Sequence, residues 1–315
     1  MRIRPLAALS VAALSAVLLA GCTGQPEPEA TPTNTTAAAD LCSVAAPSGA
    51  VSDSITVGGE VGTEATAEFE APLEITSAER TVAVEGDGDP IADGDLITYA
   101  ATIFDASTGE VLEADGYDTT IPPVSVTVGS GADQFFGCAP IGSRIVMAVP
   151  ATEQSPTAVV WVLDVLGKSP TAAWGEEQEP VDGMPTVTLA DNGQPEIEIP
   201  EGDAPTEIQI AVLKEGDGEP VAAGDTTLLQ YYGVDWETGE SFDSSWANGA
   251  PISIPGNTYV PGFIQALEGQ PVGSQVLVVI PPALGYGEAG SSEHELAGKT
   301  LVFVIDILST EHAAQ

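Results

Sequence analysis

Positive charge is what this chain has least of. Lys and Arg total 7 residues against 47 Asp and Glu, which gives a formal net charge of −40 over 315 residues. Proteins bind nucleic acid largely by neutralising phosphates with basic side chains, so this acidity excludes a nucleic-acid partner. A strongly acidic surface ordinarily serves solubility, and salt tolerance is a second interpretation.

Histidine and cysteine are also scarce. The two histidines, His294 and His312, are far in sequence from Cys42 and Cys138, so we expect no metal site. A "Glu-His-Glu" run surrounds His294, but adjacent residues do not converge on one ion, and we interpret the run as an exposed loop.

Long apolar runs are missing except at the N-terminus. Arg2 and Arg4 precede an uncharged run that ends at Cys22, which is too short to be a spanning helix and predicts a lipoprotein signal peptide over residues 1–21. The end of the run, "LAGC", resembles the bacterial lipobox, in which the cysteine receives a diacylglyceryl group. An ordinary signal peptide is the alternative. We therefore expect an extracytoplasmic protein that contacts the cell membrane only through a lipid anchor.

Export determines how the other cysteines are interpreted. Once Cys22 is lipidated, Cys42 and Cys138 remain as an even pair in an oxidising compartment, where a disulfide between them is expected. Two buried free thiols are the alternative.

The sequence contains an internal repeat of one unit. Four ordered blocks of the first half recur in the second half, and a chance match across all four is not credible. The pairs are "EGDGDPIADGD" at 85–95 with "EGDGEPVAAGD" at 215–225, "TGE" at 108–110 and at 238–240, "APIGSRIVMAVP" at 139–150 with "QPVGSQVLVVIP" at 270–281, and "TAVVWVLDVL" at 157–166 with "TLVFVIDIL" at 300–308. Between the last two blocks the second copy is eleven residues longer.

The repeat predicts two homologous domains, at residues 46–168 and 185–312, joined by a polar linker at 169–184. Residues 22–45 are rich in Pro, Thr and Ala without hydrophobic periodicity, which predicts a flexible tether. Each copy consists mostly of apolar alternating segments, and the second has one helical segment, "PGFIQALEG" at 261–269. We expect an α+β fold in which each domain wraps an antiparallel sheet on one short helix.

The aromatic residues of the second copy have a recognisable order. They are Tyr231 before the "TGE" turn, Phe242 with Asp243 after it, Val260 and Phe263 at the helix start, Tyr286 in "GYG", and Phe303 in the last strand. Over residues 207–308 this order resembles the FKBP-type peptidyl-prolyl cis-trans isomerases, and the first copy resembles them more weakly. The whole chain is similar to a bacterial, actinobacterial-like lipoprotein with two tandem FKBP-like domains.

The resemblance implies a shallow apolar pocket that holds a proline side chain and needs no cofactor. Catalytic roles would fall to Tyr231, Phe242, Asp243, Tyr286 and Phe303, and substrate binding to Val260, Phe263 and Leu296. In the family, the backbone N–H at the Val260 position and the Tyr286 hydroxyl bind substrate carbonyl groups. Proline-containing polypeptides are the expected partners, and macrolides are ligands that the family implies.

Two features depart from the family. Phe263 occupies the place where the family usually has Trp, and the apolar tip before the last strand is replaced by the polar segment "SSEHELAGK" at 291–299, where Leu296 would supply the apolar contact. The second change affects substrate preference and macrolide affinity more than the reaction.

The first copy lacks the pocket residues. It has no "GYG", and the positions of the five ring-bearing or acidic residues are held by Ala101, Leu112, Glu113, Ala132 and Trp161. The sequence therefore predicts one inactive domain and one isomerase that assists the folding of exported proteins. A non-enzymatic chaperone or protein-binding module is the alternative; a solute-binding lipoprotein has no support, because the repeat is small and lacks an α/β pattern.

Overall fold

The computed structural model describes residues 40–117, 121–256 and 258–313, and it is an α+β structure with antiparallel sheets and few helices. Within these ranges the α-helices are α1 (Leu41–Val44), α2 (Ala50–Ser54), α3 (Ala132–Phe136) and α4 (Pro261–Leu267), with 3-10 turns at η1 (Trp246–Asn248) and η2 (Pro282–Leu284). None of the helices in the described ranges could cross a membrane.

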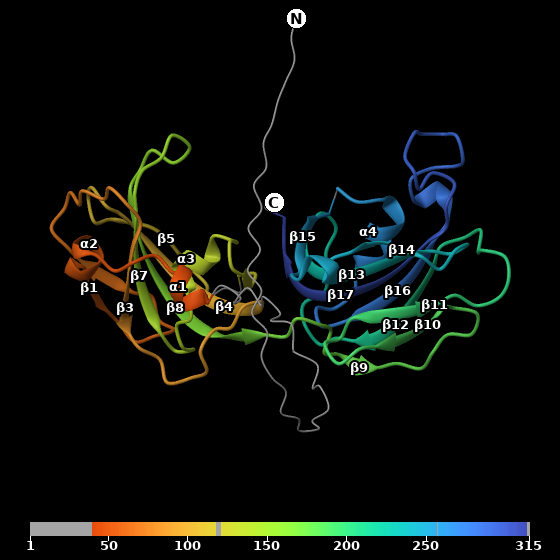
Figure 1. Ribbon diagram of the computed structural model, residues 1–315, viewed down its shortest axis with the longest axis horizontal. Helices are drawn as coiled ribbons and strands as arrows, with labels where there is room; N and C mark the ends of the chain where they lie inside the picture. The colour runs from red at the N-terminus through yellow and green to blue at the C-terminus, as the bar shows by residue number, and fades with distance from the viewer. Residues whose placement is uncertain (1–39, 118–120, 257, 314–315) are drawn as a thin grey trace, which may run out of the picture. The chain divides into compact units, whose positions relative to one another are not determined.

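Two larger sheets form the body of the chain (Figure 1). The first sheet contains β3 (Glu79–Val84), β4 (Asp95–Asp105), β5 (Val111–Asp115), β6 (Val124–Val126), β7 (Arg144–Val149) and β8 (Val159–Ser169). The second contains β9 (Glu176–Glu177), β12 (Gln209–Glu215), β13 (Thr226–Asp235), β14 (Ser241–Ser244), β15 (Ile252–Pro255), β16 (Gln275–Ile280) and β17 (Leu301–Glu311).

The two sheets share one strand order. The first runs β3-β7-β8-β4-β5 with β6 beside β4, and the second runs β12-β16-β17-β13-β14 with β15 beside β13 and β9 added at the β12 edge. Both also carry a β-bulge at the same place, in β5 opposite Ile103 and Phe104 of β4 and in β14 opposite Gly233 and Val234 of β13. The register therefore matches the spacing of the sequence repeat.

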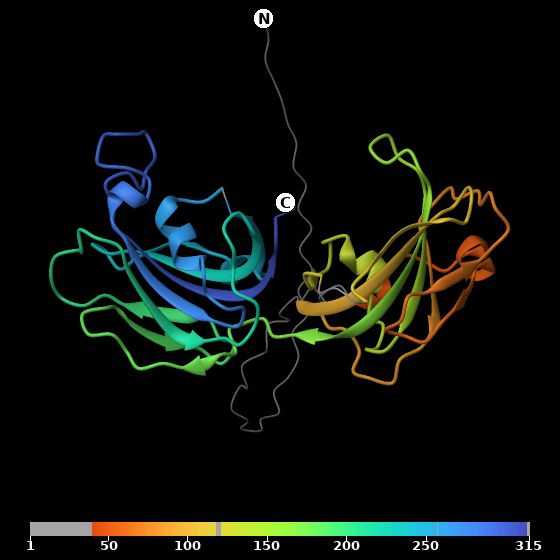
Figure 2. The same ribbon diagram turned by 180° about the vertical axis from the view of Figure 1, so that it is seen from behind.

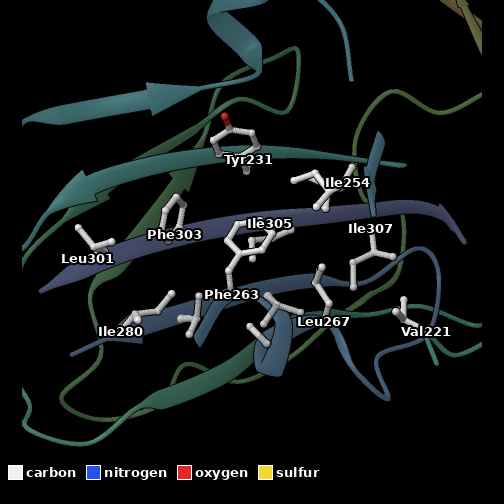
Figure 3. Close-up of a cluster of buried hydrophobic side chains, with 14 residues drawn as sticks. Val221, Tyr231, Ile254, Phe263, Leu267, Ile280, Leu301, Phe303, Ile305 and Ile307 are labelled. Atoms are coloured by element: carbon white, nitrogen blue, oxygen red, sulfur yellow. The ribbon is translucent and has the colours of Figure 1, made fainter. Parts of the chain in front are cut away.

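The second sheet is covered on both faces, which explains why its central strands are continuously apolar. Helix α4 packs on one face, while a hairpin of β10 (Thr186–Leu189) and β11 (Pro195–Glu198) lies against the other (Figure 1, Figure 2). Alternating residues of β17 divide between the two cores: Phe303 and Ile305 face α4, and Val302 and Val304 face the hairpin. Figure 3 shows the helix-side core, with Phe263 projecting from α4 onto the sheet.

The hairpin layer was not predicted from the sequence. An equivalent hairpin, β1 (Thr56–Gly58) paired with β2 (Thr66–Glu68), covers the corresponding face of the first sheet. It is held by the buried Arg144, whose guanidinium donates to Asp164 and to four backbone carbonyls of the 58–63 segment.

Two predicted boundaries need correction. Residues 41–45 were expected within the tether, but α1 forms there, Leu41 is buried in the first core, and Cys42 is joined to Cys138 by a disulfide. Residues 173–177 of the expected linker are also structured, because β9 pairs with β12 and the buried Ala173 donates its N–H to Asp306. In both places a few apolar or backbone contacts anchor a segment whose composition is otherwise that of a linker. Cys22 and the signal segment lie outside the described residues.

Candidate active site

The bulge between β13 and β14 positions Phe242, the first residue of the predicted pocket. Gly233 pairs with Asp243 and Val234 pairs with Ser241, which leaves Phe242 as the extra residue on the bulged strand. A bulge of this kind turns a side chain out of the regular alternation. Phe242 meets Phe303 of β17 edge to face, with ring centroids 5.4 Å apart and planes at 90°.

Gly233 is a site residue that sequence reasoning missed. A Cβ atom at this position would lie 2.7 Å from Phe303 and 2.8 Å from Phe242, closer than carbon atoms approach without displacement. The two rings can therefore meet only because residue 233 has no side chain. The signal was present in the repeat, since the first sheet has Ile103 at the equivalent register position.

Helix α4 supplies the floor of the site. Phe263 is fully buried and lies 5.1 Å from Phe303 and 6.1 Å from Tyr231, in both cases nearly perpendicular to the neighbouring ring. Pro261 at the first helical position starts the helix, and the Val260 carbonyl accepts the N–H groups of Phe263 and Ile264. The structure thus brings Tyr231, Phe263 and Phe303 together on the helix side of the sheet (Figure 3).

Asp243 is tied to this cluster by one hydrogen bond. The Tyr231 hydroxyl donates to Asp243 Oδ2 at 2.6 Å, and Asp243 Oδ1 accepts the Ser244 N–H at 2.8 Å. Burial raises the pKa of Tyr231, and the hydrogen bond to Asp243 raises that pKa further. Tyr231 is consequently a neutral hydrogen-bond donor held in a fixed orientation at the edge of the apolar cluster.

Tyr286 and Leu296 come from the segment between β16 and β17. Both are partly buried against the helix-side core, so the structure places them at the same cluster as the other predicted residues. The Tyr286 ring is stacked on His294 with centroids 3.7 Å apart and planes at 4°. Burial raises the pKa of Tyr286, and the negative charge of Asp243 raises it further.

Tyr259 is the second residue that sequence reasoning missed. It directly precedes Val260, and its ring lies 4.4 Å from that of Phe263 and 6.1 Å from that of Tyr231. A tyrosine in an apolar run is easily read as core filling, and only the fold shows that it faces the predicted site.

The corresponding place in the first sheet is built differently. Ala101 is buried, Leu112 is 54% exposed, and Trp161 packs edge-on against Phe135 at 5.8 Å. A hydrogen bond that protonated Glu113 can donate to Asp115 raises the pKa of Glu113, so this carboxyl group faces another acid where Asp243 faces a tyrosine. The residues of the first sheet that are equivalent to the aromatic cluster of the second sheet are therefore not packed into a similar cluster.

No group of three or more His, Cys, Asp or Glu side chains in the described ranges is arranged to hold a metal ion. The titratable partners of His312 are Asp225, whose Oδ2 lies 2.7 Å from Nδ1, and Glu219, whose Oε1 lies 2.9 Å from Nε2. This arrangement fixes the end of β17, and none of its three residues belongs to the aromatic cluster.

Similarity to known proteins identifies the family. Residues 218–308 match the model of the FKBP-type peptidyl-prolyl cis-trans isomerases. A probable FK506-binding protein of Corynebacterium glutamicum is 41% identical over 116 residues, which are 37% of this chain and 98% of that protein. The chain belongs to the FKBP-type isomerase family. An FK506-binding protein of Streptomyces anulatus is 36% identical over 119 residues, 37% of this chain and 96% of that protein.

A further relative of this FKBP-type isomerase is longer than the matched region. The FKBP-type 22 kDa peptidyl-prolyl cis-trans isomerase of Escherichia coli is 39% identical over 103 residues, which are 32% of this chain and 48% of that protein. The activity that the family carries is peptidyl-prolyl cis-trans isomerisation, and the matching segment holds the aromatic cluster of the second sheet.

Proposed function

We propose that the aromatic cluster of the second sheet is the isomerase site and that the protein assists the folding of exported proteins at the cell envelope. The observation that carries the proposal is the close meeting of Phe242 and Phe303 over Gly233, beside the Tyr231–Asp243 hydrogen bond. This combination exists on the second sheet, and Leu112, Glu113 and Ile103 replace it on the first.

The reaction needs no bond to be broken. Rotation about a peptide bond is opposed by amide resonance with a barrier of about 18–20 kcal/mol, and an X-Pro bond isomerises in roughly tens to hundreds of seconds without a catalyst. An apolar aromatic site disfavours the charge-separated planar amide relative to the less polar twisted one. Binding the twisted state more tightly than the planar state lowers the barrier.

Each residue has a specific part in this mechanism. Phe242, Phe263 and Phe303 form an apolar surface for the proline ring, and the buried faces exclude water from it. Tyr231, oriented by Asp243, closes one edge. The Val260 N–H and the Tyr286 hydroxyl are the donors that orient the substrate's carbonyl groups, and Leu296 contributes an apolar contact from the 285–299 segment.

The first sheet belongs, in this proposal, to an inactive FKBP-like domain within residues 46–168, and the active domain lies within 185–312. The shared strand order and the shared bulge support common ancestry of the two units. Because the first unit has lost the pocket residues, its role in this proposal is to act as a spacer or to dock client proteins.

Envelope anchoring rests on the N-terminal sequence. The charged start, the apolar run and "LAGC" support cleavage before Cys22 and lipidation of its thiol. The disulfide between Cys42 and Cys138 favours an oxidising compartment, since cytosolic thiols are normally kept reduced. Replacing Cys22 by Ser should release the protein from the membrane fraction and abolish labelling by a radioactive fatty acid; unchanged membrane association would contradict the anchor.

A matched pair of variants tests the site. In the full mature chain, Phe242→Ala with Asp243→Ala should lower the isomerisation rate of a proline-containing tetrapeptide to near the uncatalysed rate. Leu112→Ala with Glu113→Ala, at the equivalent positions of the first sheet, should leave the rate unchanged. Activity that survives the first pair, or is lost with the second, would place the site elsewhere.

A binding function without catalysis is the second candidate, and the exposed apolar surface of the first sheet favours it. Val111 and Leu112, adjacent on the edge strand β5, are 49% and 54% exposed. Suppression of aggregation of an unfolded protein by the mature chain, retained in the Phe242→Ala Asp243→Ala variant and lost in the Leu112→Ala variant, would establish this role in addition to, or in place of, isomerisation.

A further inference from the structure

The floor of the proposed isomerase site is covered by the protein itself. Three rings of the proposed site are almost inaccessible: Phe263 is 0%, Phe303 1% and Tyr231 4% exposed. Phe303 and Tyr231 meet Phe263 nearly perpendicularly, at 5.1 and 6.1 Å, so these contacts enclose the ring from the side. A wall that binds substrate must instead present an open surface.

Tyr259 is the closest aromatic neighbour of the floor. Its ring centroid lies 4.4 Å from that of Phe263 with the planes at 45°, the shortest aromatic distance within the cluster. The same ring approaches Tyr231 at 6.1 Å and 69°. Tyr259 itself is only partly buried, so it lies between the floor and the solvent.

Tyr259 lies in the connection between two elements. It belongs neither to β15, which ends at Pro255, nor to α4, which begins at Pro261. The Tyr259 hydroxyl lies beside that of Tyr231. Burial raises the pKa of Tyr259, so its hydroxyl is protonated and the side chain carries no charge whether it lies on Phe263 or is exposed to solvent.

We propose that Tyr259 is the specificity-determining gate of this isomerase, lying on the Phe263 floor and turning aside when a proline ring enters. The inference rests on the proposed function, since it concerns the same pocket. A ligand that binds only when the gate is open has its apparent affinity reduced by the fraction of open protein. Tyr259 would therefore penalise rigid, bulky macrolides more than an extended peptide, whose ring is small enough to share the pocket with a partly displaced tyrosine.

Removing the ring should open the site. In the full mature chain, Tyr259→Val is expected to tighten binding of the macrolide FK506, used here as the probe, by about two- to tenfold, the range expected for the loss of one aromatic pair. KM for a proline tetrapeptide should fall by a smaller factor. Tyr259→Phe keeps the ring and is the matched control, with FK506 affinity close to that of the wild type.

The outcomes separate the gate from the site. If the wild-type chain isomerises the peptide but Tyr259→Val binds FK506 no more tightly, the gate is refuted and the site stands. If the wild-type chain neither isomerises the peptide nor responds to Phe242→Ala, the proposed site fails and the gate fails with it. Equal gains in Tyr259→Val and Tyr259→Phe would assign the effect to the hydroxyl and would also refute a gate made by the ring.

A measurement on the unsubstituted chain covers the case in which Tyr259→Val does not fold. Biosynthetic 3-fluorotyrosine gives each tyrosine a fluorine resonance, and the Tyr259 signal is assigned by its absence from Tyr259→Phe. On titration with the proline tetrapeptide, the Tyr259 signal should show the largest shift of the six tyrosines, because its ring leaves the face of Phe263. A Tyr259 signal that stays in place while that of Tyr231 shifts would overturn the proposal.

Discussion

The hydroxyl of Tyr231 donates a hydrogen bond to the carboxylate of Asp243 over 2.6 Å, joining strands β13 and β14 at the edge of the aromatic cluster. Tyr231 is buried whereas Asp243 is exposed, so the bond fixes the Tyr231 ring of the aromatic cluster from the surface side. An exposed carboxylate is hydrated, which weakens any direct electrostatic effect on a substrate carbonyl. Asp243 is therefore assigned to positioning Tyr231.

This assignment predicts non-additive variants. Tyr231→Phe and Asp243→Val should each lower kcat/KM for a proline tetrapeptide by about ten- to a hundredfold, since a hydrogen bond to a charged group contributes roughly 1.5–3 kcal/mol. The double variant should lose no more than either single variant, because each removes the same interaction. Rate measurements on the four proteins complete the cycle. Losses that multiply in the double variant would show that Asp243 acts on the substrate independently of Tyr231.

The absence of a side chain at Gly233 carries the next prediction. Gly233→Ala places a Cβ within 2.7 Å of Phe303 and 2.8 Å of Phe242, so one of the two rings must move. We expect kcat/KM to fall more than tenfold and the free energy of unfolding to fall by about 1–3 kcal/mol, as for other overpacked sites. Isomerase assays and urea denaturation measure the two effects.

Ile103→Ala is the matched control for this prediction, because Ile103 has the equivalent position on the first sheet. It should change stability, through the loss of buried methyl groups, but leave the isomerisation rate as it is. Full activity in Gly233→Ala would mean that the close meeting of the rings is not needed for catalysis.

The sequence predicted the members of the aromatic cluster better than their surroundings. Tyr231, Phe242, Phe263 and Phe303 could be found because each has a side chain of a recognisable type at a spacing that the strands preserve. Gly233 could not be singled out in the same way, since its contribution is the space that it leaves, and that space exists only after β13, β14 and β17 are aligned.

The parts that the sequence did not predict depend on tertiary contacts. The β1–β2 and β10–β11 hairpins are short and polar on one side, and they become stable only against the apolar back of a sheet. Ala173 has no pattern of its own, and its place is fixed by the buried carboxylate of Asp306. Local secondary-structure propensity predicts neither the packing of these hairpins nor the position of Ala173.

The stack of His294 on Tyr286 yields a prediction about the segment between β16 and β17. The rings are 3.7 Å apart and nearly parallel, so His294 restrains Tyr286. The Tyr286 hydroxyl is the group proposed to donate a hydrogen bond to a substrate carbonyl. His294→Ala should lower kcat/KM by about two- to tenfold, the range for one aromatic pair, whereas His294→Phe should retain most of the rate. Peptide assays compare the three proteins. Equal losses in both variants would show that the stack is not what matters at this position.

A final prediction compares two buried aspartates at equivalent places in the two sheets. On the first sheet Asp164 pairs in register with Arg144 and accepts two hydrogen bonds from its guanidinium, at 2.6 and 2.7 Å. On the second sheet Asp306 pairs in register with Gln275, which donates one bond at 2.7 Å. Asp306 thus pairs with a neutral amide where Asp164 pairs with a guanidinium, and burial raises the pKa of Asp306.

The raised pKa fixes the sign of the pH dependence. A carboxyl group whose pKa is higher in the folded protein than in the unfolded chain stabilises the fold while it is protonated, and that contribution is lost as the pH rises through the folded pKa. Asp306→Asn should remove this loss and leave the free energy of unfolding unchanged or higher at neutral pH. The amide can still accept from Ala173, and a rotated Gln275 amide can accept from Asn.

Asp164→Asn should behave in the opposite way. It leaves the Arg144 guanidinium buried without its counter-ion, and breaking a buried ion pair by removing one partner costs about 3–5 kcal/mol. Urea denaturation of the two variants at pH 5 and pH 8 measures both effects. Because both aspartates are buried in register-equivalent positions, equal destabilisation by the two substitutions would contradict the role given to Arg144 and would indicate that the shared geometry, and not the cation, determines the cost.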